Sequence, residues 1–187
     1  MQEVKEVLKS QFKGLKDYIV LVTVDAKAYE RSILDFVRYY VNDLNIAGVY
    51  VTLNKPFHII ERNLAANDIK HELMIYIDAA SRVPTKKVGN CLYIGSPEKL
   101  SDISVAMDQA VKALPSEEKF LIFDSLNTLS IFNNPNTVAR FVHFLVSKIR
   151  EWKVKGVLIT LEKETSQDII DALTQFSDAR LNLGGDA

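Results

Sequence analysis

The sequence predicts an α/β fold of three layers, in which helices cover both faces of a mainly parallel, twisted sheet. Short apolar runs rich in Val and Ile recur along the chain, and segments with a helical period lie between them. Apolar runs without polar alternation are typical of strands that are buried on both faces. Their alternation with helices indicates a parallel α/β sheet.

Five apolar runs are predicted to be strands of this sheet. Each is short and mostly continuous, and together they span Tyr18–Val24, Gly48–Leu53, Leu73–Asp78, Phe120–Asp124 and Gly156–Leu161. The segment 83–97 is the least regular part of the chain, because it contains two prolines and two glycines. Its short apolar run Cys91–Ile94 fits either an edge strand or a hairpin.

Helices are predicted between these strands from apolar stripes and from start signals. From Ala28 to Leu44 and from Pro135 to Trp152, apolar residues recur with the spacing of a helix that packs one face on a sheet. Asn134 before a proline is typical of an N-cap followed by a first-turn proline. Similar signals predict a helix after Lys55-Pro56 and another that begins near Ser101 and ends at Pro115.

The length and composition of the chain predict one domain. The chain has 187 residues, which is enough for one well-buried core and short for two. Its 48% hydrophobic and 25% charged residues are typical of a soluble globular protein. We therefore predict a single domain over residues 1–187, with an N-terminal helix at about 2–16 and the core at about 18–183.

The charge balance argues against nucleic acid as a partner. The net charge is −1, from 23 basic and 24 acidic side chains. A nucleic-acid-binding domain usually carries a basic excess that neutralises phosphates. The stretch Thr85-Lys86-Lys87 is short and is interpreted as a solvated loop.

The N-terminal segment and the cysteine content predict a cytoplasmic protein with no membrane partner. Residues Met1–Lys16 are charged and have a helical pattern instead of an apolar signal core. No apolar run approaches the length that spans a membrane. The single cysteine, Cys91, excludes a disulfide within the chain and suits a reducing compartment.

One strand end carries the most specific motif of the chain. The run Phe120–Asp124 ends in a carboxylate, and Ser125 and Leu126 follow it. Together with the stretches around it, this motif makes the chain from about Tyr18 to Leu183 resemble the KaiC-like branch of the RecA ATPases. The stretches that match in order and approximate spacing are Gly48–Leu53 with Pro56, Met74–Asp78, Leu121–Leu126, Gly156–Thr160 and Ala179–Leu183.

The resemblance implies a RecA-like fold and a nucleotide bound after the first strand. It gives Asp124 the place of the Walker B carboxylate, which holds Mg²⁺ through water. In the same family a Walker A loop, G-x-x-x-x-G-K-[ST], follows the first strand. Its glycines let backbone N–H groups wrap the phosphates, its lysine reaches the β and γ phosphates, and its hydroxyl binds Mg²⁺.

The loop at this position departs from the family pattern. Its eight residues, 25–32, read D-A-K-A-Y-E-R-S, so that Asp25 and Glu30 replace the two glycines and Arg31 replaces the lysine. Only the hydroxyl position is kept, by Ser32. An acidic side chain adds negative charge where phosphate would lie, and a Cβ restricts the positive φ values that a phosphate loop uses.

Arg31 keeps a positive charge but has two interpretations. It can bind phosphate, although its planar guanidinium differs in shape from the lysine ammonium. It can equally form a surface pair with Glu30 or Asp35, and this second interpretation is the more common situation for an arginine at the start of a helix.

A second departure follows the second strand. KaiC-like ATPases usually carry acidic residues there that help to activate the attacking water, whereas this chain has Asn54 and Lys55. An amide does not titrate, and an unperturbed lysine is protonated at neutral pH, so neither is a general base. Ser32, Asp124 and Ser125 remain as candidate contacts for Mg²⁺ or nucleotide.

Other polar residues are interpreted as structural. Asp78 at the end of the third strand is expected to cap a turn. Glu162 and Glu164 either contact a ligand or a neighbouring subunit, or favour the N-terminal dipole of the next helix. No metal site is expected from the three scattered histidines, His58, His71 and His143.

These observations predict a non-catalytic RecA-like protein that serves as a regulatory or protein-interaction module in signal transduction. Such a module would bind a protein partner or form a homo-oligomer, with no cofactor and no catalytic residue. The alternative is an ATP-binding protein or weak ATPase, with Mg-ATP as its cofactor. It would use Arg31 for the phosphates and Ser32 with Asp124 for Mg²⁺.

Overall fold

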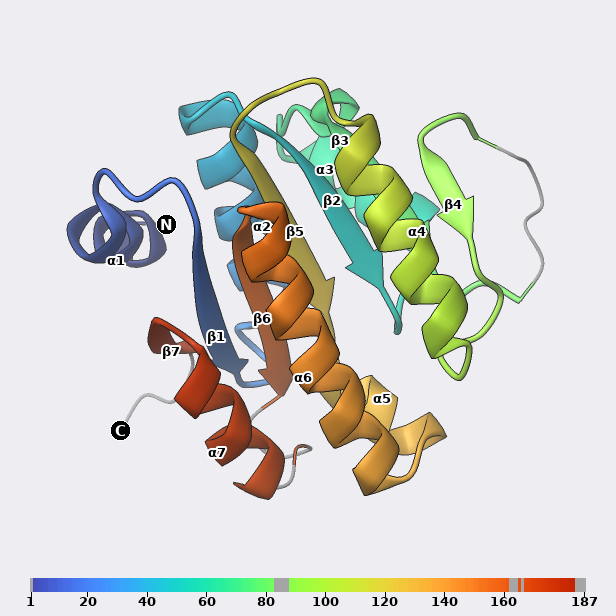
Figure 1. The fold of residues 1–187 in the computed structure, drawn as a ribbon. Coiled ribbons are helices and arrows are strands. Elements are labelled where there is room, and N and C mark those ends of the chain that lie inside the picture. The colour runs from blue at the N-terminus through green and yellow to red at the C-terminus, as the bar shows by residue number, and fades with distance from the viewer. Residues whose placement is uncertain (1, 83–87, 162–164, 166, 184–187) are drawn as a thin grey trace.

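Seven strands form one sheet in the computed structural model, which describes residues 2–82, 88–161, 165 and 167–183 (Figure 1). They are β1 (Tyr18–Val24), β2 (Ala47–Thr52), β3 (Met74–Asp78), β4 (Cys91–Tyr93), β5 (Lys119–Asp124), β6 (Lys155–Leu161) and β7 (Ala179–Leu183). The strand order is β4-β3-β2-β5-β6-β1-β7, and each pairing is parallel. The predicted parallel α/β sheet is confirmed.

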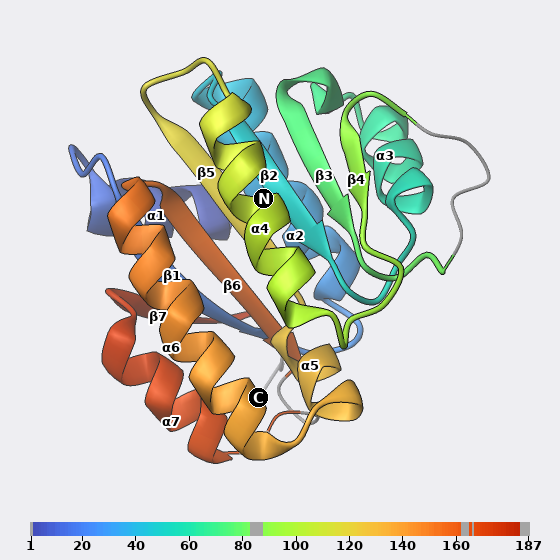
Figure 2. The same ribbon diagram turned by 45° about the vertical axis from the view of Figure 1, so that its right-hand side comes forward.

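Helices cover both faces of the sheet, which confirms the three layers (Figures 1 and 2). The first face carries α1 (Gln2–Phe12), α2 (Tyr29–Arg38) with its π-helical extension η1 (Tyr39–Asp43), and α3 (Phe57–Ala66). The second face carries α4 (Leu100–Ala113), α5 (Leu126–Phe132), α6 (Pro135–Trp152) and α7 (Gln167–Phe176). A 3-10 turn, η2 (His71–Leu73), precedes β3.

The structure corrects one local prediction, adds one helix and decides between two alternatives. The N-terminal helix ends at Phe12, earlier than the predicted position near 16, and the chain then turns at Gly14 with φ of 83°. The short helix α5 has no counterpart in the predicted pattern; it follows β5 directly, and the Asp124–Ser125 peptide bond is cis. The run at Cys91–Tyr93 is an edge strand, because β4 pairs in parallel with β3.

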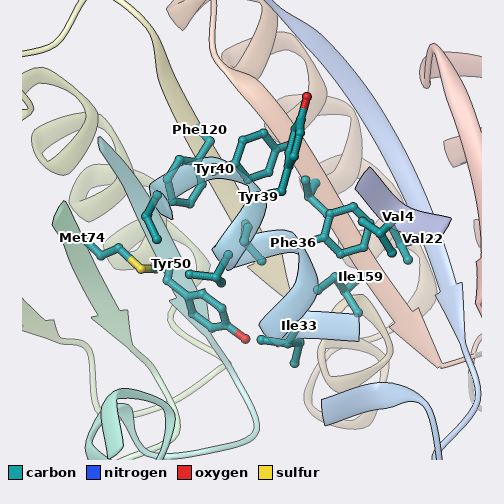
Figure 3. Close-up of a cluster of buried hydrophobic side chains, with 14 of the residues drawn as sticks. Val4, Val22, Ile33, Phe36, Tyr39, Tyr40, Tyr50, Met74, Phe120 and Ile159 are labelled. Carbon is teal, nitrogen blue, oxygen red and sulfur yellow. The ribbon is translucent and has the colours of Figure 1, made fainter. Parts of the chain in front are cut away.

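Alternating side chains of each strand fill two buried clusters, one on each face. Along β1, for example, Val20 and Val22 pack in the first cluster and Leu21 packs in the second. Figure 3 shows part of the first cluster, including Tyr50 and Phe120. This two-sided burial explains why the strands appear in the sequence as continuous apolar runs.

The parallel arrangement brings all strand ends to one edge of the sheet. The chain leaving β1 and β2 enters α2 and α3 on the first face, whereas the chain leaving β5 and β6 enters α5 and α7 on the second. Because β2 and β5 are neighbouring strands, the chain segments that follow them leave for opposite faces of the sheet at this point. Open α/β sheets bind ligands at such a point outside the carboxyl ends of the strands.

Candidate functional site

A tight turn connects β1 to α2 at the carboxyl edge. The Asp25 carboxylate accepts a hydrogen bond from the backbone N–H of Ala28 at 2.7 Å, and α2 begins at the next residue, Tyr29. Ala28 has right-handed helical torsion angles, and positive φ values are found elsewhere in the described chain but at none of residues 25–32. The acidic residue at the first glycine position therefore stabilises the turn and the start of the helix.

Two tyrosines surround the carboxylate at the end of β5. Asp124 is fully buried. The Tyr29 hydroxyl donates toward both of its oxygens, at 2.5 Å from Oδ1 and 2.6 Å from Oδ2. The Tyr50 hydroxyl of β2 donates to Oδ2 at 2.6 Å, and Asn54 Nδ2 donates to the Tyr29 oxygen at 2.8 Å. The four side chains form one continuous hydrogen-bond network, in which Asp124, Tyr29 and Tyr50 are buried and Asn54 is exposed.

Burial shifts the ionisation of this network. It raises the pKa of Asp124 from its ordinary value of 3.8 to about 6, against the opposing effects of the Tyr29 and Tyr50 hydrogen bonds and the charge of Lys55. Burial, together with the nearby Asp124 charge, also raises the pKa of Tyr29 and the pKa of Tyr50. Both hydroxyls therefore keep their protons at neutral pH and remain donors to the carboxylate.

An ion pair covers the outer side of Tyr29. Lys55 Nζ lies 2.5 Å from Glu30 Oε1 and 5.2 Å from the centroid of the Tyr29 ring. Lys55 lowers the pKa of Glu30 through its hydrogen bond and its charge. The Glu30 side chain is 64% exposed, so the pair adds little stability. The pair does bring into contact the two places where the sequence departs from the KaiC-like pattern. Glu30 replaces a loop glycine, and Lys55 replaces an acidic residue after β2.

The remaining loop residues have ordinary structural partners. The Arg31 side chain is 77% exposed, and its Nε lies 3.9 Å from Asp35, the partner that the sequence allowed as an alternative to phosphate. The Ser32 hydroxyl donates to the Ala28 carbonyl at 2.9 Å. Ser125 is buried, with its hydroxyl 3.0 Å from that of Thr128.

The other candidate residues lie apart from this network. Asp78 accepts hydrogen bonds from the backbone of Phe57, Ala80 and Ser81, which supports its interpretation as a cap. Glu162 and Glu164 lie outside the described residues. Over the described residues no group of His, Cys, Asp and Glu could hold a metal ion, and no helix is long and apolar enough to cross a membrane.

Sequence reasoning did not identify Tyr29 and Tyr50 as site residues. Tyr29 occupies a variable position of the loop pattern, and Tyr50 lies within an apolar strand. Their relation to Asp124 depends on the sheet order, in which β2 pairs with β5 and places Thr52 opposite Asp124. The one signal in the sequence is a tyrosine hydroxyl, that of Tyr50, two residues before the end of the strand β2.

Comparisons with known proteins agree with this architecture. The family DUF7504, described as a family of unknown function, matches residues 68–183, more than half of the chain. The structure is similar to that of a KaiC-like protein from the hyperthermophilic archaeon Pyrococcus horikoshii, with a TM-score of 0.65 and 15% identity over 90% of this chain and 73% of that one. This likeness confirms the predicted RecA-like, KaiC-like fold. No curated protein matches the sequence.

Proposed function

The chain belongs to DUF7504, a family of unknown function, and we propose that it is a non-catalytic protein of KaiC-like fold that acts as a regulatory or protein-interaction module in signal transduction. The observation that carries the proposal is the contact of the Tyr29 hydroxyl with both oxygens of Asp124. The fold alone does not decide function, so the argument rests on the site.

The tyrosine network argues against Mg²⁺ at Asp124. Mg²⁺ requires oxygen ligands in near-octahedral geometry at about 2.0–2.1 Å and keeps several of its waters. Here hydroxyl groups of Tyr29 and Tyr50 already hydrogen-bond the carboxylate, in a position without solvent exposure. A hydrated ion would have to displace both, and the residues present do not fit it.

The loop after β1 argues against a triphosphate. Glu30 brings a negative charge to the first turn of α2, where phosphate would otherwise benefit from the helix dipole. The nearby cation Lys55 is engaged by Glu30. Arg31 extends toward solvent beside Asp35. The charges around the loop therefore balance one another without a phosphate.

An apolar surface at the same edge supports a protein partner or self-association. Ile131 and Phe132 of α5 are 71% and 44% exposed and border a cavity of about 740 Å³ that also reaches Asn54. Large exposed apolar side chains beside a hollow are typical of interaction surfaces. In this proposal the fold serves to present that surface.

Calorimetric titration with Mg-ATP tests the loss of nucleotide binding. We expect no heat of binding for the native chain at about 1 mM Mg-ATP, because neither the phosphates nor the metal has a suitable site. The same titration with Mg²⁺ alone and with Asp124→Asn provides the controls. Micromolar binding by the native chain that Asp124→Asn abolishes would overturn the proposal.

The alternative function is ATP binding or weak ATPase activity. It is favoured by one observation, the presence of Ser32 and Asp124 at the positions where a related ATPase holds Mg²⁺. It requires Tyr29 to leave Asp124 when nucleotide binds. Slow phosphate release from ATP that disappears in Asp124→Asn would establish it.

A further inference from the structure

A cavity of about 830 Å³ lies at the opposite edge of the sheet from Asp124. It is formed where the end of α1 and residues 13–16 pass the amino ends of β1 and β6 and the helix η1. Figures 1 and 2 show α1 beside the amino end of β1. Small-molecule sites commonly have volumes of about 300–1,000 Å³, so this cavity has the size of a ligand site.

The surface inside the cavity is mostly apolar, and three aromatic rings contribute to its walls. The rings of Phe12 and Tyr18 stack with centroids 4.1 Å apart, and Tyr39 also lines the cavity. Leu15 and Leu44, which line it too, are 51% and 38% exposed. A guest that covers these two leucines would remove apolar surface from water, which is the main source of affinity in such a site.

The polar groups at the base of the cavity are already satisfied. Lys155 is buried, and its ammonium donates to the carbonyls of Leu15 and Lys16 at 3.2 and 2.7 Å and to Glu118 at 2.9 Å. These three bonds use all the donors of a lysine. Lys155 therefore holds the segment between α1 and β1 in place, and its charge is already paired and is not available to a ligand.

The charges around the cavity have a positive excess. Lys9, Lys13 and Lys16 line it and form no ion pair within the described residues, whereas Glu6 is the one lining acid besides the Lys155 partner Glu118. The lysine ammonium groups would attract an anionic group of a ligand and would repel a cationic one. The positive charge around the cavity and its apolar walls together favour a ligand with an apolar body and a negatively charged head.

We propose that this cavity binds an anionic amphiphile, a small molecule with an apolar chain or ring system and a carboxylate head. The chain would lie against Leu15 and Leu44, beside the largely buried rings of Phe12 and Tyr18, and the head would face the lysines of α1 and the following segment. The site lies at the edge away from Asp124, so it stands independently of the proposed loss of nucleotide binding.

Titration with decanoate, followed by calorimetry and by NMR of the leucine methyl groups, tests this site. We expect saturable binding below the micellar concentration, with the largest shifts at Leu15 and Leu44. Decyltrimethylammonium has the same chain length and a positive head, and it should bind at least about tenfold more weakly. The decanoate affinity should also fall as salt is added, since the lysines are exposed.

A charge reversal with a matched control separates the site from a general effect of net charge. Lys13→Glu/Lys16→Glu should weaken decanoate binding by about tenfold or more. Arg62→Glu/Arg140→Glu changes the net charge equally on exposed positions of α3 and α6 and should leave the affinity unchanged. Circular dichroism confirms that each variant is folded.

Three results would overturn the proposal. They are no decanoate binding by the folded native chain at about 1 mM, equal binding of the cationic probe, and methyl shifts confined to residues away from the cavity. Self-association through the exposed leucines, seen as dimers by sedimentation without decanoate binding, would assign this face to a second copy instead.

Discussion

Substitution of Tyr29 by phenylalanine is expected to lower the free energy of unfolding by roughly 3 kcal/mol at pH 7. The variant keeps the ring but removes the hydroxyl that contacts both oxygens of Asp124 and accepts from Asn54. In the variant, the Tyr50 hydroxyl is the remaining donor of this network to the Asp124 carboxylate. A buried charge that loses a hydrogen-bond donor destabilises the folded state. Urea denaturation of both proteins measures the difference.

Tyr39→Phe is the matched control for this prediction. It removes the same atom from a residue that is also largely buried, but the Tyr39 hydroxyl makes no hydrogen bond within the described residues. We expect a change of less than about 0.5 kcal/mol. In the double variant Tyr29→Phe/Asp124→Asn, the loss should be smaller than the sum of the two single losses, because the charge that needs the hydroxyl is absent. Equal losses for Tyr29→Phe and Tyr39→Phe would contradict the network.

Stability is expected to fall by about 2.5 kcal/mol between pH 4 and pH 7 through Asp124 alone. Its pKa is about 6 in the folded protein and 3.8 ordinarily, so the folded state binds the proton more tightly than the unfolded state. The contribution is therefore fully present below pH 3.8 and is lost as the pH rises through 6. Its direction is opposite to that of a carboxylate held by a salt bridge.

Asp124→Asn isolates this contribution from the other titrating groups. The asparagine does not titrate, so the stability of the native chain relative to the variant should decline across this pH range and level off above pH 6. Unfolding free energies from urea denaturation at pH 4, 5, 6 and 7 test the trend. If the unfolding free energy of the native chain minus that of the variant instead stays constant with pH or grows as the pH rises, burial does not raise the pKa of Asp124.

The sequence contains enough information for the fold because its strands are buried on both faces. Runs such as Tyr18–Val24 have no polar alternation, and this pattern leads directly to a parallel sheet with helices on each side. The edge strand β4 was ambiguous since three residues between glycines and prolines carry little periodic signal. The helix α5 was missed because seven residues are too few to show a clear apolar stripe.

The site was predictable only in part. The replacement of loop glycines by Asp25 and Glu30 is visible in the sequence, and so is the carboxylate at Asp124. The contact between Tyr29 and Asp124 joins residues 95 positions apart and depends on side-chain orientation, which no periodicity encodes. For the same reason, the sequence does not reveal that Glu30 of the loop pairs with Lys55, which lies in the separate departure after the second strand.

The enhancement of water-proton relaxation by Mn-ATP is the most direct test of the claim that tyrosine hydroxyls replace a metal at Asp124. Mn²⁺ accepts the same oxygen ligands as Mg²⁺, and its effect on water relaxation rises when the complex tumbles with a protein. The tyrosine network predicts the same relaxation rate with the native chain, with Asp124→Asn and without protein. An enhancement with the native chain that Asp124→Asn removes would contradict it.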